Sequence, residues 1–108
     1  MVLATIGRFR VEVPTTRRER MRGLLGRTGL APGTGMLFPG ARSVHSVGMR
    51  FSILAVFLDP DLRVIEVRRL PPGRLAWNRH ARHVLELGEG ESLGGTDRLE
   101  LHPSRRWR

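Results

Sequence analysis

The chain has 108 residues, of which 19 are basic and 10 acidic, so its formal net charge is +9, and it contains no cysteine. This length fits one domain with a single core, and the lack of cysteine excludes disulfides and thiolate metal sites. No apolar run reaches the roughly 18 residues of a membrane span, and the N-terminus is strand-like where a signal peptide would have a charged start and a long apolar stretch. We therefore expect a cytoplasmic protein.

The basic residues are all arginine. An excess of positive charge favours nucleic-acid binding, because phosphate contacts give affinity for any nucleotide sequence. These arginines are scattered along the chain, however, and the complete avoidance of lysine is typical of a compositional bias. The acids gather in the last quarter: Glu86, Glu89, Glu91, Asp97 and Glu100. Nucleic-acid binding through the arginine-rich surface is therefore the alternative prediction and not the first one.

The N-terminal third predicts a strand followed by a short helix. Val2–Val13 has the apolar side chains of a strand, with a bend or turn possible at Gly7. Thr16 and Glu19 have the spacing of a capping box, in which the hydroxyl and the carboxylate each accept a hydrogen bond from a free backbone N–H. We expect one short helix near residues 16–25. We expect its buried stripe to consist of Met21, Leu24 and Leu25. Gly26 or Gly29 is able to end the helix.

The stretch Ser43–Asp59 predicts the central strand of the fold. Its first half alternates, with His45 and every second residue after it on one side. From Ile53 to Leu58 every side chain is apolar, which is typical of a strand covered on both faces. The pattern therefore indicates one strand that begins half-solvated and ends fully buried.

The second half of the chain predicts a hairpin, a long loop and further strands. Asp59–Leu62 has the residues of a tight turn, so Ser52–Leu58 and Leu62–Arg68 should pair antiparallel. Pro71–His80 is expected to be a long loop of functional character, because it carries a large aromatic side chain. The remaining expected segments are strands at His83–Leu87, Met36–Phe38 and Arg98–Leu101.

Many short strands, frequent turns and one helix indicate a mainly β fold. We expect a compact sandwich or barrel-like single domain over residues 1–102. Residues 103–108 are expected to form a basic, mobile tail, because short basic segments at chain ends are usually poorly ordered.

Seven blocks of the sequence match one known family in the family's order and near its spacing: Val11–Val13, Glu19–Arg27, Gly35–Phe38, His45–Phe51, Phe57–Asp59, Arg82–Leu87 and Asp97–Leu99. With these blocks the chain resembles the family catalogued as domain of unknown function 192. The resemblance implies a small, mainly β fold and no particular reaction. Relatives tend to have Pro and then Asp where this chain has Ser52 and Leu54, so a carboxylate-dependent site is not expected. The segment 88–96 is shorter than the family's usual small helical turn, so we expect that end of the molecule to be trimmed or more open.

Five residues form the candidate ligand site: His45, Arg50, Trp77, Asn78 and Arg79. The imidazole and the guanidinium groups suit an anion, and an exposed indole can stack on a planar ligand. A second interpretation is structural: a half-buried His45 bonded to a carbonyl, Trp77 as a loop anchor, and arginines paired with acids. For Arg22 and Arg50 the expected acids are Asp59 and Glu86.

Enzymatic function is not favoured by the sequence. Serines near His45 lack a positioned acid and a nucleophile elbow, and the glycine-rich stretches do not follow the strand-to-helix pattern of phosphate loops. His80 and His83 have metal-like spacing only on a helix, so neither a metal nor a cofactor is expected. The sequence predicts a non-catalytic binding module for a small anionic ligand or peptide in a shallow cleft; a hydrolase is the least favoured class.

Overall fold

The computed structural model describes residues 1–103. Of the predicted tail at 103–108, Pro103 belongs to a strand and residues 104–108 lie outside the described residues. The elements in chain order are β1 (Val2–Ile6), β2 (Phe9–Val13), α1 (Arg17–Arg22), β3 (Thr34–Pro39), β4 (Ser43–His45), β5 (Ile53–Leu58), β6 (Val64–Leu70), β7 (Leu75–Trp77), β8 (His83–Gly88) and β9 (Leu101–Pro103). The mainly β prediction with one short helix is confirmed. Within residues 1–103, no helix has the length and apolar character needed to cross a membrane.

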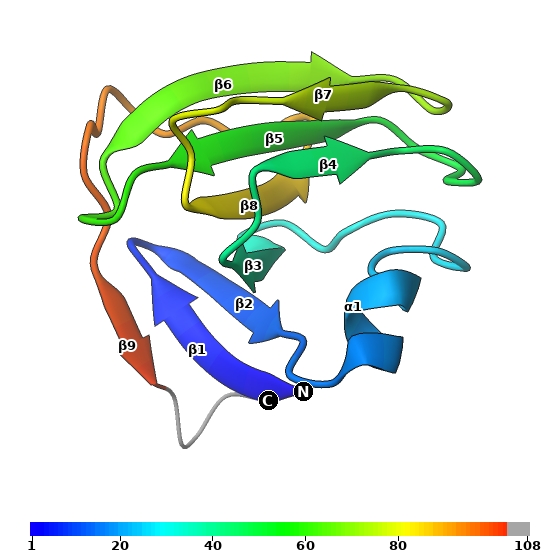
Figure 1. Ribbon diagram of the computed structural model, residues 1–108, viewed down its shortest axis with the longest axis horizontal. Helices are drawn as coiled ribbons and strands as arrows, with labels where there is room; N and C mark the ends of the chain where they lie inside the picture. Colours follow the sequence, from blue (N-terminus) through cyan, green and yellow to red (C-terminus); the bar gives the residue numbers. More distant parts are fainter. Residues whose placement is uncertain (104–108) are drawn as a thin grey trace.

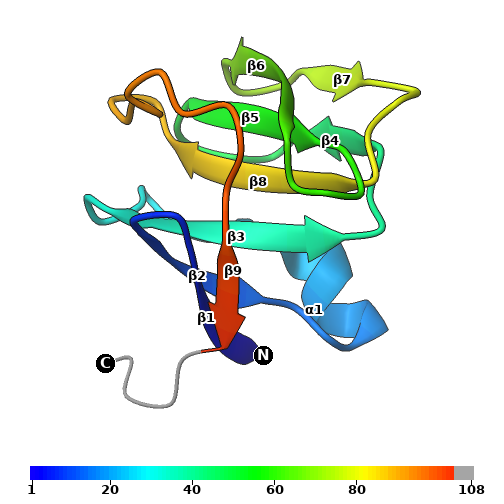
Figure 2. The same cartoon turned by 90° about the vertical axis from the view of Figure 1, so that its left-hand side faces the viewer.

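Seven strands form one sheet in the order β6-β5-β8-β3-β2-β1-β9, and β4 and β7 form a second, two-stranded sheet. Neighbouring strands of the large sheet are antiparallel except for the parallel pair β2–β3. Figures 1 and 2 show that the large sheet twists strongly, so that β1, β2 and β9 lie on the side of the molecule away from β4 and β7. The sheet does not close into a barrel.

The central strands β3, β5 and β8 are covered on both faces. On one face Ala55 and Phe57 pack with Val44 and Ala76 of the small sheet. The opposite face contributes alternate residues of the same strands to a second cluster that includes side chains of β1 and β2. The prediction that Ile53–Leu58 is buried on both sides is therefore confirmed, because this strand lies between two packed layers.

The predicted central strand is wrong in its first half. β4 ends at His45 and belongs to the small sheet, whereas β5 begins at Ile53 in the large sheet. Between them the N–H of Met49 donates to the carbonyl of Ser46, and Gly48 has a φ of 82°. A tight turn with a left-handed residue cannot continue an extended strand, so the alternation in this segment is not that of a strand.

The hairpin prediction is confirmed: β5 and β6 pair antiparallel from Ile53↔Leu70 to Leu58↔Val64. The Asp59 side chain accepts hydrogen bonds from the N–H groups of Asp61 and Arg63, as the turn sequence indicates. The loop prediction for Pro71–His80 is wrong at its centre, where β7 pairs with β4. The last strand lies later than predicted, and its Pro103 pairs with Ala4 of β1.

The helix is shorter than predicted. Its capping box is present, with the hydroxyl of Thr16 accepting from the N–H of Glu19 at 3.1 Å. Gly23 ends it at a φ of 48°, earlier than either predicted glycine. Because Leu24 lies beyond this end, the expected helical stripe does not form: Leu24 is buried but Met21 is 70% exposed.

Candidate functional site

A cavity of about 430 Å³ opens between α1, the turn that follows it, and β4. This volume lies in the range of small-molecule sites, roughly 300–1,000 Å³. The polar residues lining it are Arg20, Arg22, Arg42, Ser43, His45 and Glu86, and the larger apolar ones are Met21, Leu24, Leu25, Phe38, Val44 and Met49. The lining therefore combines a hydrocarbon wall with several cationic groups and one acid.

Glu86 lies in the interior of the protein, on the central strand β8. Its cross-strand neighbours are Met36 in β3 and Ala55 in β5, and the residue is only 6% exposed. Within residues 1–103, no hydrogen bond or ion pair reaches its carboxyl group. A buried carboxyl flanked by a thioether and a methyl group is costly to keep charged, because nothing replaces the water it has lost.

Burial raises the pKa of Glu86 to about 8. At pH 7 the carboxyl is therefore mostly neutral, and a neutral carboxylic acid offers one O–H donor as well as an acceptor oxygen. Because Glu86 is buried and also lines the cavity, we refer to the part of the lining formed by its carboxyl group as the cavity floor. Within residues 1–103 this carboxyl group has no hydrogen-bond partner.

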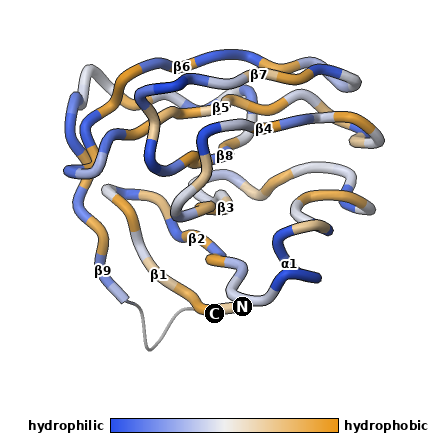
Figure 3. Tube along the Cα trace, in the orientation of Figure 1, coloured by the Kyte–Doolittle hydropathy of each residue, from blue (hydrophilic) through white to orange (hydrophobic). Residues whose placement is uncertain are grey.

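The opening of the cavity is cationic. Arg22, Arg42 and His45 are exposed, and within residues 1–103 none of them is joined to an acidic side chain. Arg20 donates from Nη1 to the carbonyl of Pro39 at 3.0 Å, which holds α1 against the end of β3. Figure 3 shows α1 as one of the most hydrophilic parts of the chain. With Glu86 mostly neutral, the charge lining the cavity is positive.

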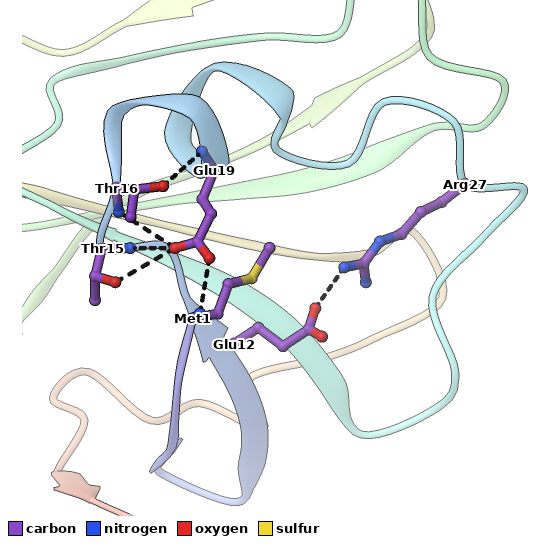
Figure 4. A network of polar contacts seen from close by, with 6 residues as sticks. All are labelled: Met1, Glu12, Thr15, Thr16, Glu19 and Arg27. Carbon is purple, nitrogen blue, oxygen red and sulfur yellow. Dashed lines mark hydrogen bonds and ion pairs between the residues drawn. The ribbon is translucent and has the colours of Figure 1, made fainter.

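The wall formed by α1 is fixed by a polar network on its far side (Figure 4). The N-terminal ammonium of Met1 donates to Glu19 at 2.8 Å, and the N–H groups of Thr15 and Thr16 also donate to this carboxylate. The ammonium and these N–H groups hold the pKa of Glu19 down to about 2. Beyond the helix, Arg27 pairs with Glu12 of β2 at 2.6 Å, so both ends of the wall are tied to the sheet.

A family model for DUF192, described as Uncharacterized ACR, matches residues 2–102. The chain belongs to the DUF192 family. No curated protein sequence matches it. A crystal structure of a protein of unknown function from Novosphingobium aromaticivorans is similar, with a TM-score of 0.74 and 22% identity over 93% of this chain and 83% of that one. At these identities a structural likeness establishes the fold alone.

A second similar structure comes from Sinorhizobium meliloti, and that protein is described as "a putative transcription regulator". Its TM-score is 0.76 at 21% identity, covering 94% of this chain and 92% of that one. Both likenesses extend along nearly the whole DUF192 chain, so the three proteins have similar folds.

The predicted site residues of this DUF192 protein are only partly brought together. His45 lines the cavity, but Arg50, Trp77, Asn78 and Arg79 do not. His45 and Trp77 do share the outer face of the small sheet, because His45 pairs with Leu75 and Ser43 with Trp77. Residues two apart on a strand point to the same side, so the imidazole and the indole are diagonal neighbours.

Asn78 has a structural role in this arrangement. Its side-chain nitrogen donates to Glu66 at 3.0 Å, and its side-chain oxygen accepts from the N–H of His80 at 2.9 Å. Arg79 contacts the ring of His80, and Trp77 is 66% exposed, so the indole does not anchor the segment by burial.

The expected ion pairs of Arg22 and Arg50 with Asp59 or Glu86 are absent from residues 1–103. In the same part of the chain, no three His, Asp or Glu side chains lie close enough together to hold a metal ion. His83 accepts the N–H of Gly40 on Nδ1 at 3.1 Å, and burial lowers its pKa although Asp59 opposes this. His83, the first residue of β8, is therefore a neutral imidazole with a structural role, because it accepts a hydrogen bond from the backbone.

Ser46 joins the two turns beside the small sheet. Its hydroxyl donates to the carbonyl of Pro71 at 2.5 Å and accepts from the N–H of Arg74 at 2.9 Å. The residue is fully buried, so this contact fixes the turn after β4 against the turn before β7. It thereby fixes the position of His45 at the cavity.

Sequence reasoning missed Glu86 as a residue of the ligand site and considered it as a partner for arginine. The available signal was its place in the segment His83–Leu87, where it is the one acid among side chains typical of a central strand. An acid in a strand buried on both faces indicates either a buried pair or a cavity, and here it lines a cavity.

Proposed function

We propose that this DUF192 protein is a non-catalytic binding module for a small organic anion, held in the cavity between α1 and β4. The observation that carries the proposal is the charge of the cavity: Arg22, Arg42 and His45 stand at its opening without acidic partners within residues 1–103. A guanidinium without a partner is suited to a carboxylate or a phosphate, which it binds through two parallel hydrogen bonds.

A binding role is favoured over catalysis by the groups around His45. Ser43 also lines the cavity, but within residues 1–103 no hydrogen bond joins a serine hydroxyl to the imidazole. An activated serine needs a base within hydrogen-bonding reach and a third group that orients the base. Neither relation is present around His45 in that part of the chain.

The test is a calorimetric screen of small carboxylates and phosphates against the wild-type protein and single variants. We expect Arg22→Ala and Arg42→Ala each to weaken binding about tenfold or more, because each removes a charge-assisted hydrogen bond. Arg50→Ala is the matched control, since it removes the same charge from an exposed position outside the cavity. If Arg50→Ala or Trp77→Ala weakens binding and Arg22→Ala does not, the anion binds on the outer face of the small sheet and not in the cavity.

Nucleic-acid binding is the second candidate, and the distribution of charge favours it. Residues 39–58 and 67–85 contain seven arginines and not one acid. These segments supply both strands of the small sheet, whose outer face exposes Leu75 and Trp77. A basic surface with an exposed aromatic ring is suited to single-stranded nucleic acid, because bases stack on the ring while arginines contact phosphates.

We expect binding of single-stranded oligonucleotides to weaken steeply with salt and to weaken further in Trp77→Ala, as measured by fluorescence anisotropy. Arg22→Ala, in the cavity wall, is the control for this face. An absence of binding at low salt would remove this candidate and leave the first untouched.

A further inference from the structure

We propose that Glu86 binds the inner end of the ligand as a protonated carboxylic acid, so that the cavity takes an amphipathic organic acid with an uncharged oxygen acceptor far from its anionic group. This inference rests on the proposed function, since the anionic group is the part held at the opening. It adds the chemistry of the other end of the ligand.

A ligand that fills the cavity changes the surroundings of the Glu86 carboxyl group. The carboxyl is buried, lines the cavity and has no hydrogen-bond partner within residues 1–103. A ligand that fills the cavity displaces the water that can reach this group. Because a buried polar group without a partner is costly, a ligand that supplies a partner binds better than one of the same shape that does not.

The groups around the cavity favour an uncharged oxygen over an ammonium group as the ligand atom that contacts Glu86. The charged groups facing the cavity from the neighbouring elements are Arg20 and Arg22 of α1 and Arg42, and the imidazole of His45 faces it as well. The cross-strand neighbours Met36 and Ala55 carry no charge. An ammonium group would have to pass this cationic opening and lose its own water to reach the floor. An uncharged ligand oxygen is not repelled by the cationic opening and loses less hydration, and it accepts a hydrogen bond from the O–H of the neutral acid.

The apolar lining of the cavity determines which chemistry suits the middle of the ligand. The cavity is also lined by hydrocarbon and thioether groups, among them Leu24, Phe38, Val44 and Met49, all of which are buried. Such a wall favours an aliphatic or aromatic body without polar atoms. The ligand class is therefore an oxo acid or a related acid whose carbonyl, hydroxyl or ether oxygen is separated from the anionic group by several carbons.

Two matched probes separate this inference from the proposed function: octanoate, and 7-oxooctanoate, which has the same anionic group and chain length with a ketone near the other end. Calorimetry on the wild-type protein at pH 6 should give about tenfold tighter binding of 7-oxooctanoate, the gain of one buried hydrogen bond. This preference should disappear above the pKa of Glu86, about 8, where the acid has lost its proton.

Variants give the decisive comparison. Glu86→Gln keeps a donor that does not titrate, so the preference for 7-oxooctanoate should persist across the pH range. Glu86→Leu removes the donor, so octanoate should still bind and the preference should be lost. Circular dichroism verifies that each variant is folded, and the Glu86→Gln variant decides the question if the Glu86→Leu variant is not.

Equal binding of the two probes by the wild-type protein overturns the inference but leaves the proposed function standing. A loss of preference in Glu86→Gln also overturns it, because the amide keeps a donor at this position. Tighter binding of 7-aminoheptanoate that rises with pH overturns it too, because that outcome requires an ionised Glu86. No binding of any of these acids at low salt overturns the inference, whereas the proposed function is overturned only if the whole screen of small carboxylates and phosphates gives no binding.

Discussion

Between pH 6.5 and pH 8 the free energy of unfolding should fall by roughly 1 kcal/mol for each pH unit, and Glu86→Gln should remove that fall. Burial raises the pKa of Glu86 to about 8 in the folded protein, whereas the unfolded chain has the ordinary value of 4.5. A group whose pKa is raised by folding contributes stability that is fully present below 4.5 and is lost as the pH rises through the folded value.

The comparison with Glu86→Gln separates Glu86 from the other shifted groups. Burial lowers the pKa of His83 below its ordinary 6.5, so His83 makes the protein more stable as the pH rises toward and just past 6.5, and it does so equally in the wild-type protein and the variant. The pKa of Glu19 is lowered to about 2, so its contribution changes only under acidic conditions. The difference in slope between the wild-type protein and Glu86→Gln therefore reports Glu86.

Urea unfolding followed by circular dichroism at several pH values measures this slope. Glu100→Gln is the matched control, because it makes the same substitution at a carboxylate that is 82% exposed. The amide introduced by Glu86→Gln also keeps a hydrogen-bonding group of nearly the same size at the floor, so a cavity left by a smaller side chain does not complicate the comparison. An unchanged slope in Glu86→Gln would show that the carboxyl is ionised or solvated in the folded state.

Much of the fold could be predicted from the sequence because its signals are local. Thr16 and Glu19 define a capping box within one turn, and the Asp59 turn satisfies its own backbone N–H groups. The apolar run Ile53–Leu58 indicates burial on both faces without any knowledge of what covers them. Each of these features depends on residues within a few positions of one another.

The site could not be predicted because it depends on distant contacts. The alternation after His45 resembles a strand, but Ser46 is bound to Pro71 and Arg74, about 25 residues away, and these bonds set the turn that ends β4. The cavity needs α1 beside β4 and a strand-central acid from β8 beneath both. The positive charge of the protein could be predicted from its composition. The position of Glu86 beneath the cationic groups follows only from the pairing of β8 with β3 and β5.

The second large effect concerns the strand pair beneath the cavity floor. Gly35 of β3 lies so close to β8 that an added Cβ would stand 2.5 Å from the carbonyl oxygen of Glu86 and 2.7 Å from Cδ2 of Leu87. Its φ is not in the left-handed region, so the glycine is needed for space and not for backbone conformation. Gly35→Ala should lower the free energy of unfolding by about 3 kcal/mol or more, because a backbone atom in a central strand cannot move aside as a flexible side chain can.

Gly88→Ala is the matched control, since Gly88 also lies in a strand of this sheet, but an added Cβ would meet nothing nearer than Cβ of Leu30 at 3.9 Å. We expect that variant to unfold at nearly the wild-type urea concentration. Because Gly35→Ala pushes on the carbonyl of Glu86 itself, any folded fraction should also show a smaller preference for 7-oxooctanoate over octanoate. Equal stability of the two alanine variants would mean that β3 and β8 are not in close contact at this position, and the floor of the cavity would then have a different shape.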